Sequence, residues 1–242
     1  QGPSFTVSTA CSSGGDAINT ACMCMQSGKA DIMLAVGAES VLCPLVIYSL
    51  ANAKALSRRN DSPSTASRPF DVTRDGFVIG EGGGALVLET EEHALARGAK
   101  IYAEIRGCGN TDDAYHVTAP HPEGRGAIAC MKQAIAEAGI NPSDIGYINA
   151  HGTATNKGDT VETSSIKKVF GNTLPYVSST KGATGHMMGA GGITETITCV
   201  KAIETGTVPP TINLNEVDPE CAGIDFVANS AKKAEINFAM SN

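Results

Sequence analysis

Three residues of this sequence could together form a nucleophilic active site: Cys11, His151 and His186. Cys11 lies in the segment Thr-Ala-Cys-Ser-Ser-Gly (residues 9–14), and each histidine lies in a glycine-rich segment far along the chain. A cysteine thiolate is a strong nucleophile, and an imidazole can donate or accept a proton near neutral pH. One cysteine with two such histidines therefore indicates thiol chemistry supported by two acid-base groups.

The residues around Cys11 favour a reactive thiol. The β-branched run at 5–9 predicts a short strand, and the apolar spacing that follows Cys11 predicts a helix. Unpaired N–H groups and the helix dipole favour an anion at a helix N-terminus by up to about 2 kcal/mol. We therefore expect Cys11 at a strand-to-helix turn, with a thiol pKa below its ordinary value of about 8.5.

The other seven cysteines lie in apolar runs or near loops, with no Cys-x-x-Cys pair and no spacing suited to zinc. Free cysteine most often behaves as a small buried apolar residue. We predict this packing role for Cys22, Cys24, Cys43, Cys108, Cys130, Cys199 and Cys221.

Strand-like segments lead into both histidine turns. Residues 145–149 are typical of a strand that ends before His151, and residues 176–179 of a strand that precedes the turn with His186. Because strand, reactive turn and helix recur, we predict an α/β protein of related halves whose strand ends converge on one site. Similar patterns predict strands at 30–37, 84–89 and 100–106, the first covered on both faces, helices at 126–139, 161–170 and 192–206, and an ordered surface loop at 56–74.

Two glycine-rich segments do not predict nucleotide binding. Residues 80–85 precede a strand instead of linking a strand to a helix, and residues 189–192 lack the ending of a phosphate-binding loop. The second segment instead predicts close helix packing beside His186.

Composition excludes several functional classes. A net charge of −7 without a basic stripe argues against a general nucleic-acid binder. No stretch has the ~20 apolar residues of a membrane span, and the start lacks the pattern of a secretion signal. Eight cysteines without a small-domain disulfide pattern suit a reducing compartment. We expect a bacterial cytoplasmic protein, or one of an organelle matrix or stroma, without nucleic-acid or membrane partners.

The motifs around these residues resemble the active-site motifs of the β-ketoacyl-acyl-carrier-protein synthases. They are residues 9–14, Asn-Ala-His-Gly-Thr-Ala-Thr at 149–155 followed by Asp159, and Ser-Ser-Thr-Lys at 178–181 leading to Gly-His at 185–186. Further similar segments lie within 55–61, 67–71, 74–78 and 208–214, so the resemblance covers essentially the whole chain. It is greatest to the synthase II type of fatty-acid elongation, ahead of modular polyketide ketosynthases.

The resemblance implies a thiolase-like α/β fold with five αβαβα layers, here incomplete. Part of the N-terminal half and the last C-terminal turn and strand are expected to be absent. Residues 1–242 would then be a single partial ketosynthase domain, with 1–90 from the N-terminal half and 91–242 the C-terminal half. The absent turn would supply one N–H group of the oxyanion hole, which leaves the activity of this chain alone open.

The resemblance also implies a decarboxylative Claisen condensation. Cys11 would carry an acyl primer, and His151 and His186 would stabilise the enolate formed when malonyl-acyl carrier protein loses carbon dioxide, giving a β-ketoacyl thioester. Lys181 would support the histidines as a cation. The remaining implied residues are Thr153 and Thr155, which would bind the pantetheine arm, and Asp159 and Glu195, which would orient catalytic groups. Each of these four could instead cap a helix or turn.

The implied partner is an acidic acyl carrier protein, which brings its own 4'-phosphopantetheine, so we expect no resident cofactor and no metal. Lys54, Arg58 and Arg59 form a candidate docking patch on an otherwise acidic chain, with a solvated loop as the alternative. The full-length enzyme is expected to be a homodimer that acts on malonyl and acyl thioesters.

Three alternatives remain at this stage. The chain could be a polyketide ketosynthase, or an inactive thiolase-fold fragment or subunit with a structural role. A cysteine protease or transglutaminase is disfavoured, because it leaves the second histidine and Lys181 unexplained.

Overall fold

The N-terminal part of the chain forms a two-stranded sheet and the helix that follows Cys11. The structure, a computed structural model, describes residues 2–242, and in it η1 (Ala10–Ser12) leads directly into α1 (Ser13–Gln26). Strands β1 (Ile32–Glu39) and β2 (Gly82–Glu89) pair antiparallel over their full length. The shorter elements of this part are α2 (Pro44–Asn52), η2 (Pro63–Thr65) and α3 (Glu91–Ala96).

The C-terminal part forms a parallel sheet of three strands in the order β4-β3-β7. The strands are β3 (Ile145–Asn149), β4 (Tyr176–Ser178) and β7 (Phe238–Ser241). The helices are α4 (Arg125–Ala138), α5 (Asn156–Phe170), α6 (Lys181–Thr184) and α7 (Gly191–Thr205). The remaining short elements are η3 (Pro142–Asp144), η4 (Met188–Ala190), η5 (Pro219–Cys221), β5 (Thr207–Val208) and β6 (Lys232–Lys233).

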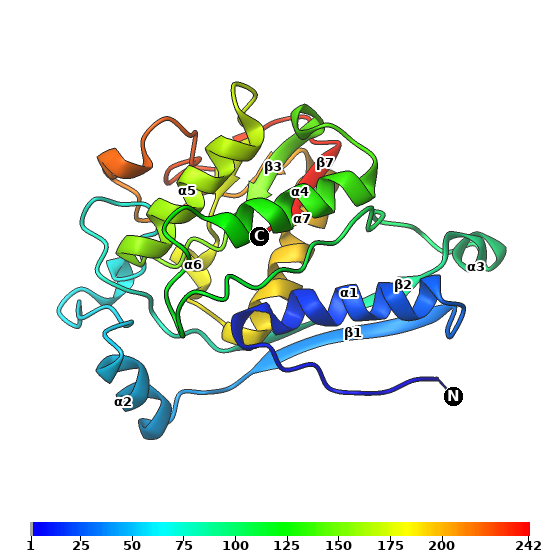
Figure 1. The fold of residues 1–242 in the computed structure, drawn as a ribbon, viewed down its shortest axis with the longest axis horizontal. Helices are drawn as coiled ribbons and strands as arrows, with labels where there is room; N and C mark the ends of the chain where they lie inside the picture. Colours follow the sequence, from blue (N-terminus) through cyan, green and yellow to red (C-terminus); the bar gives the residue numbers. More distant parts are fainter. Residues whose placement is uncertain (1) are drawn as a thin grey trace.

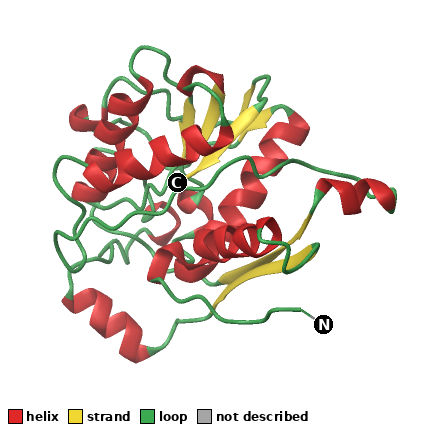
Figure 2. Ribbon diagram, turned by 45° about the vertical axis from the view of Figure 1, so that its right-hand side comes forward, coloured by secondary structure: helices red, strands yellow, loops and turns green. Residues whose placement is uncertain are grey.

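The two sheets lie on opposite sides of a central helix layer (Figures 1 and 2). α4 and α5 pack on one face of the β3 sheet through Met131, Ile135 and Ile166, and α7 packs on its other face through Cys199 and Ala202. α7 and α1 together cover one face of the β1 sheet. The order of layers is therefore α, β, α, β, which confirms the layered α/β prediction for four of the five expected layers.

The outer face of the β1 sheet differs from the prediction. Burial alternates along β1, so Ala35 faces the helices whereas Ile32, Leu34 and Val36 are exposed. The expectation that this strand is covered on both faces is wrong for the residues that the structure describes.

Two predicted strands do not form. Residues 5–9 and 100–106 have no regular secondary structure, because neither segment lies in a ladder with another strand within residues 2–242. β-branched composition alone does not make a strand when no partner supplies backbone hydrogen bonds.

The predicted surface loop at 56–74 is ordered but not wholly superficial. Phe70 is fully buried in the core beneath α5 and stacks on Phe226, and Asp71 and Arg74 are buried as well. Among the cysteines, Cys199 and Cys221 are buried as expected, whereas Cys43 is exposed. No helix within residues 2–242 is long and apolar enough to cross a membrane.

Candidate active site

The predicted nucleophile meets one predicted histidine directly. The Cys11 Sγ lies 3.0 Å from Nε2 of His186, although 175 positions separate the two residues in sequence. Cys11 sits in η1 just before α1, after Ala10 in a left-handed conformation with φ of 54°. The sulfur of Met188 lies on another side of the thiol, 3.9 Å from Sγ.

Glycine allows the close approach of α1 and α7, the helices that follow Cys11 and His186 in the chain. A Cβ at Gly14 would lie 2.7 Å from the backbone nitrogen of Ile193, and a Cβ at Gly192 would lie 2.4 Å from that of Gly15. Both contacts are closer than side chains tolerate, so the start of α1 touches the start of α7 backbone to backbone. This confirms the close packing predicted for residues 189–192.

The second histidine lies against the first. The rings of His151 and His186 are 5.2 Å apart between centroids and meet edge to face at 89°. The rings of Phe77 and His186 also meet edge to face, with 5.2 Å between their centroids. The three sequence motifs therefore converge on one place.

An extended segment, residues 76–80, holds both histidine turns. The N–H of Gly76 donates to the carbonyl of Ala154, in the turn after His151, at 3.0 Å. The N–H of His186 donates to the carbonyl of Val78 at 2.7 Å, and the N–H of Gly80 donates to the carbonyl of His186 at 2.9 Å. Sequence analysis noted part of this segment as a family match but gave it no role.

A buried ion pair lies behind the histidines. Lys181 at the start of α6 is 2% exposed, and its ammonium pairs with the carboxylate of Glu195 on α7. An unpaired cation would be costly at this depth, and the contact with Glu195 offsets part of that cost. The Ser67 hydroxyl fixes the same turn by donating to the Lys181 carbonyl at 2.5 Å.

Both imidazoles are neutral at physiological pH. Burial, together with the Lys181 cation, lowers the pKa of His186 to about 3. The same two causes and the neighbouring His186 hold the pKa of His151 well below its ordinary value. A neutral imidazole carries one N–H donor and one acceptor nitrogen, so each ring can donate a hydrogen bond without first binding a proton.

The Cys11 thiol shows the opposite of the expected shift. Burial raises the pKa of Cys11, and it outweighs the lowering by Lys181 and by the residue's own backbone N–H. The expectation of a lowered pKa is wrong because the cost of burying a charged Cys11 sulfur outweighs the effect of the helix terminus. The resting site therefore contains a thiol beside a neutral imidazole.

Glu162 is a site residue that sequence analysis missed. Its carboxylate accepts the N–H groups of His151 at 2.8 Å and Gly152 at 2.7 Å, and also the side-chain amide of Asn242 at 2.7 Å. Glu162 follows Asp159 by three residues in α5, so both face the turn at 150–155. This spacing was the available signal, because a second carboxylate on the buried face of a helix needs a partner.

The weaker predicted residues lie near the same turn. Asp159 is fully buried and accepts the N–H of Phe70 at 2.8 Å, with Arg74 at 3.5 Å. Thr153 and Thr155 share a hydrogen bond of 3.0 Å between their hydroxyls. Within residues 2–242 neither histidine ring has a hydrogen bond with any of these three side chains.

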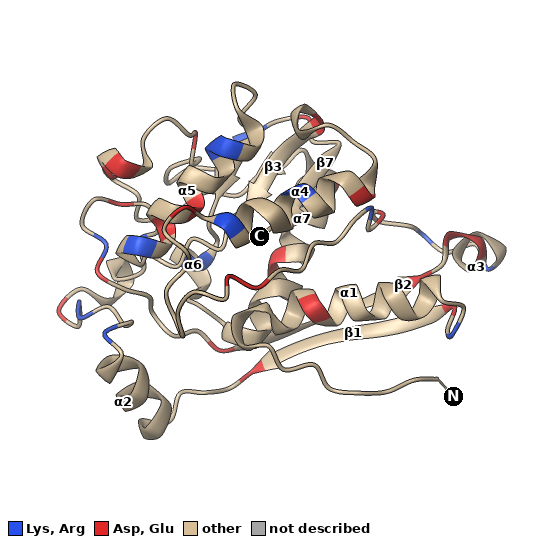
Figure 3. Cartoon of the chain, viewed as in Figure 1, with Lys and Arg blue, Asp and Glu red and all other residues tan. Residues whose placement is uncertain are grey.

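The candidate docking residues lie on the loop beyond α2, where Figure 3 shows several basic positions. Lys54 and Arg58 are exposed. Arg59 turns inward, donating to the Thr73 carbonyl at 2.6 Å and lying 3.7 Å from the Asp75 carboxylate. Two of the three cations are therefore free to meet a partner.

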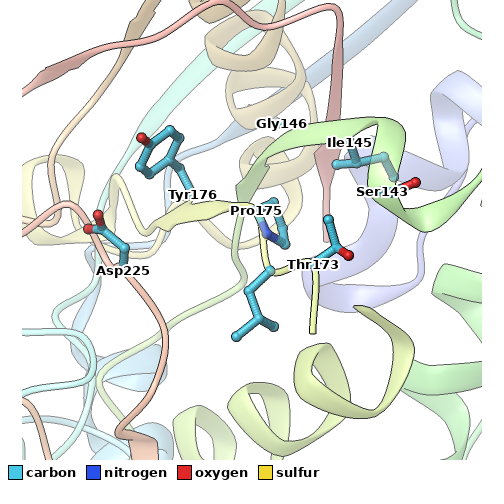
Figure 4. A pocket seen from close by; sticks show the side chains of 8 residues that line it. Ser143, Ile145, Gly146, Thr173, Pro175, Tyr176 and Asp225 are labelled. Carbon is cyan, nitrogen blue, oxygen red and sulfur yellow. The ribbon is translucent and has the colours of Figure 1, made fainter. Parts of the chain in front are cut away.

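A hollow of about 440 Å³ lies elsewhere, at the start of β3 and β4 (Figure 4). Ser143, Gly146, Tyr176 and Asp225 line it, and no predicted catalytic residue does. Within residues 2–242 no three or more His, Cys, Asp or Glu residues are placed to hold a metal ion.

Two family models match consecutive parts of the chain. Residues 1–94 match the beta-ketoacyl synthase N-terminal domain, and residues 102–215 match the beta-ketoacyl synthase C-terminal domain. Cys11 therefore lies in the region that matches the N-terminal domain, and both histidines lie in the region that matches the C-terminal domain.

Curated relatives match over the whole chain. A 3-oxoacyl-(acyl-carrier-protein) synthase 2 of Rhizobium meliloti is 48% identical over 245 residues, and a mitochondrial 3-oxoacyl-(acyl-carrier-protein) synthase of Arabidopsis thaliana is 46% identical over 248 residues. The chain spans 58% of the first protein and 54% of the second.

Solved ketosynthases share the fold. In the structure of a type II polyketide synthase acyl carrier protein with its ketosynthase, bound to a hexaketide, the matching chain is 39% identical with a TM-score of 0.96. The match covers 99% of this chain and 59% of that one. The layered α/β arrangement is therefore the thiolase-like fold expected from the sequence.

Proposed function

The chain belongs to the beta-ketoacyl synthase family, and we propose that its site catalyses decarboxylative Claisen condensation on an acyl group held by Cys11. The observation that carries this proposal is the contact of Cys11 Sγ with His186 Nε2 at 3.0 Å, with the ring of His151 against the same imidazole. A thiol and two neutral imidazoles fit a reaction that needs a nucleophile first and hydrogen-bond donors second.

In the first half-reaction, the Cys11 sulfur attacks the carbonyl carbon of an acyl thioester. Because burial keeps the thiol protonated, His186 Nε2 takes its proton as the carbon–sulfur bond forms. The low pKa of His186 makes the resulting imidazolium a strong acid, so it returns the proton to the departing pantetheine sulfur. The products are an acyl-Cys11 thioester and a free pantetheine thiol.

In the second half-reaction, a malonyl thioester loses carbon dioxide and becomes an enolate. After the first half-reaction the proton of neutral His186 is on Nδ1, and proton exchange with solvent moves it to Nε2. His186 Nε2–H can then donate to the enolate oxygen, and His151 supplies a second N–H donor. Removing one such donor typically costs about 3–4 kcal/mol in the barrier. The enolate carbon attacks the acyl-Cys11 carbonyl, the bond to the Cys11 sulfur breaks, and the resulting thiolate takes one proton from solvent.

The proposed partner is an acyl carrier protein. The name of the Rhizobium meliloti relative includes this carrier, and the solved polyketide ketosynthase is in complex with one. An acidic carrier would meet Lys54 and Arg58, and Thr153 and Thr155 would hold its pantetheine arm beside His151. We propose no resident cofactor, a homodimeric full-length enzyme, and a bacterial cytoplasmic or organellar location.

Polyketide synthesis is the second candidate, favoured by the hexaketide-bound ketosynthase at 39% identity. The identities of 46–48% to curated 3-oxoacyl synthases favour fatty-acid elongation as the first. The two candidate functions can be distinguished by comparing how fast Cys11 is loaded with straight-chain acyl groups and with poly-β-ketoacyl groups.

The test is acyl loading of the chain, followed by mass spectrometry of its cysteine peptides. Incubation with an acyl-acyl carrier protein should place the acyl group on the peptide that contains Cys11, and malonyl-acyl carrier protein should then remove it as a β-ketoacyl product. Cys11→Ala should abolish loading, while Cys24→Ala, with the same circular dichroism spectrum, should not. Equal loading of Cys11→Ala and the unchanged protein would refute the proposal.

A further inference from the structure

A carboxylate in the first turn of α1 lies against the nucleophile turn, residues 9–12. Asp16 is half-buried, and its Oδ2 accepts the hydroxyl of Thr9 at 2.5 Å. The hydroxyl of Ser12 lies 2.8 Å from the same oxygen and 2.9 Å from the Thr9 carbonyl. Within residues 2–242 the Thr9 hydroxyl has no other hydrogen-bond partner. Because Thr9 and Ser12 lie on either side of Cys11 in the chain, one carboxylate oxygen bridges the nucleophile turn.

The nucleophile turn needs support because its backbone is strained. Ala10 has a φ of 54°, a left-handed conformation that is unfavourable for a residue with a side chain. Such a conformation persists only where its surroundings hold it. Ser13 supplies one support, since its hydroxyl accepts the N–H of Thr9 at 2.9 Å and donates to the carbonyl of Ala10 at 2.6 Å. Asp16 supplies a second support from the next turn of α1.

The other carboxylate oxygen of Asp16 reaches the segment before α4. Oδ1 accepts the side-chain amide of Asn110, on the stretch that runs from α3 to α4 beside α1 (Figure 1). The backbone N–H of Asn110 donates to the side chain of Gln133 on α4 at 3.2 Å, which fixes Asn110. Position 16 lies about 200° around the helix from Gly14. Since Gly14 touches α7, the first turn of α1 is held on two opposite sides.

The tie to Asn110 bears on the proton transfer from Cys11 to His186. The Cys11 Sγ and the His186 Nε2 are 3.0 Å apart, and they belong to the two different matched regions, 1–94 and 102–215. Their distance therefore depends on how the nucleophile turn is placed against the second region. A misplacement of about 1 Å in a reacting group can slow a reaction about 100-fold. Asn110 lies in the second region, so Asp16 joins the two regions directly.

We propose that Asp16 is a positioning residue for the acylation of Cys11. With one oxygen it holds Thr9 and Ser12 across the strained turn, and with the other it fixes that turn to Asn110. A carboxylate suits this role, because both of its oxygens can accept hydrogen bonds at the same time. The inference rests on the function proposed above, since its measure is the rate of that acylation.

The test is single-turnover loading of Cys11 from an acyl-acyl carrier protein at increasing carrier concentrations. Asp16→Ala removes both acceptor oxygens, and we expect the loading rate at saturation to fall about 10–100-fold. The half-saturating carrier concentration should stay the same, because the candidate docking patch is untouched. Asp16→Asn keeps a side chain of the same size that can hydrogen-bond on both sides, so it should recover most of the rate.

Thr9→Val and Thr20→Val are a matched pair of further variants. The Thr9 hydroxyl donates to the carboxylate of Asp16, whereas the Thr20 hydroxyl donates to the backbone carbonyl of Asp16 at 2.6 Å. Thr9→Val should slow loading, and it should add little to Asp16→Ala in the double variant. Thr20→Val should load at the rate of the unchanged protein. Thr9→Val also supplies the measurement if Asp16→Ala does not fold.

Two results would overturn the role of Asp16 and leave the proposed function standing. One is an equal saturating rate in Asp16→Ala and the unchanged protein, after correction for the folded fraction by circular dichroism. The other is a loss in Thr20→Val as large as that in Thr9→Val, which would indicate general weakening of α1. An unchanged protein that loads no acyl group on Cys11 would instead overturn the proposed function, and this inference with it.

Discussion

At the scale of single residues, burial and the charge of Lys181 together explain why both histidines are neutral. The Lys181 ammonium is buried with Glu195 behind the two histidines, and it lowers the pKa of both rings. The histidines are thereby suited to donating hydrogen bonds and poorly suited to holding a proton. His186 can therefore hold the proton of Cys11 only briefly before passing it to the departing sulfur.

Neutralising this ion pair should raise the pKa of His186. The variant Lys181→Met with Glu195→Gln removes the cation without leaving an unpaired buried carboxylate. We expect the His186 ring to titrate at a higher pH than in the unchanged protein, yet still below the ordinary value, because burial is the larger cause. NMR titration of the ring protons measures this, and identical midpoints would show that the lysine has no electrostatic role.

The low pKa of His186 also makes the free energy of unfolding depend on pH. The unfolded chain binds a proton at His186 near the ordinary value of about 6.5, whereas the folded chain does so only near 3. Acidification below about pH 6.5 therefore favours unfolding, by up to about 1.4 kcal/mol per pH unit for this group. In urea unfolding between about pH 7 and about pH 4, the free energy of unfolding should fall less steeply with decreasing pH in His186→Gln than in the unchanged protein. Equal slopes for the two proteins would contradict a lowered pKa of His186 in the folded chain.

At the scale of elements, the position of the nucleophile depends on how closely α1 meets α7. Gly14→Ala would place a Cβ 2.7 Å from the Ile193 nitrogen and force the helices apart. We expect a cost of about 1–3 kcal/mol in unfolding free energy and a slower acylation of Cys11.

Gly15→Ala is the matched control, because a Cβ at Gly15 has open space around it. In the same helix it should increase stability by about 0.5–1 kcal/mol through helix propensity. Thermal and urea unfolding of the two variants compare them directly. If both alanines had the same effect, close helix packing would not be what positions Cys11.

Helices and strands whose faces and ends are marked by nearby residues were predicted correctly from the sequence. Strand β3 was located to the residue, and α4 and α7 to within one residue at each end, because apolar periodicity and bounding glycines mark them. The strands expected at 5–9 and 100–106 were wrong, since strand formation depends on a neighbour that local sequence cannot supply.

For the site, motifs identified Cys11, both histidines and Lys181, whose side chains the structure brings together. Glu162 was missed because the spacing that places it beside Asp159 does not identify its partners, which are two backbone N–H groups and the distant Asn242 side chain. The raised pKa of Cys11 was missed because local sequence reveals the helix terminus but not how deeply tertiary packing buries it.

At the scale of the whole molecule, a net charge of −7 opposes an acidic partner, so binding must be local. Lys54 and Arg58 are the exposed cations of the candidate docking patch, whereas Arg59 is engaged with Thr73 and Asp75. Docking is therefore expected to depend more on Lys54 and Arg58 than on Arg59.

Arg58→Glu should weaken binding of an acyl carrier protein, with the largest difference at low ionic strength, where charges are least screened. Lys29→Glu, an equal change of charge at an exposed lysine just after the end of α1, should have little effect. Titration calorimetry at two salt concentrations measures both variants. Equal weakening by the two would point to net charge in place of a local patch.

The sequence separation of 175 residues between Cys11 and His186 also has a consequence for folding. Contacts between distant residues form late, because the entropy of closing a long loop must be overcome before they stabilise anything. During synthesis Cys11 leaves the ribosome long before its partner exists, and its thiol stays unshielded until the histidine turns close over it. The appearance of an imidazole-paired thiol is thus a marker that one of the longest-range contacts of the fold has formed.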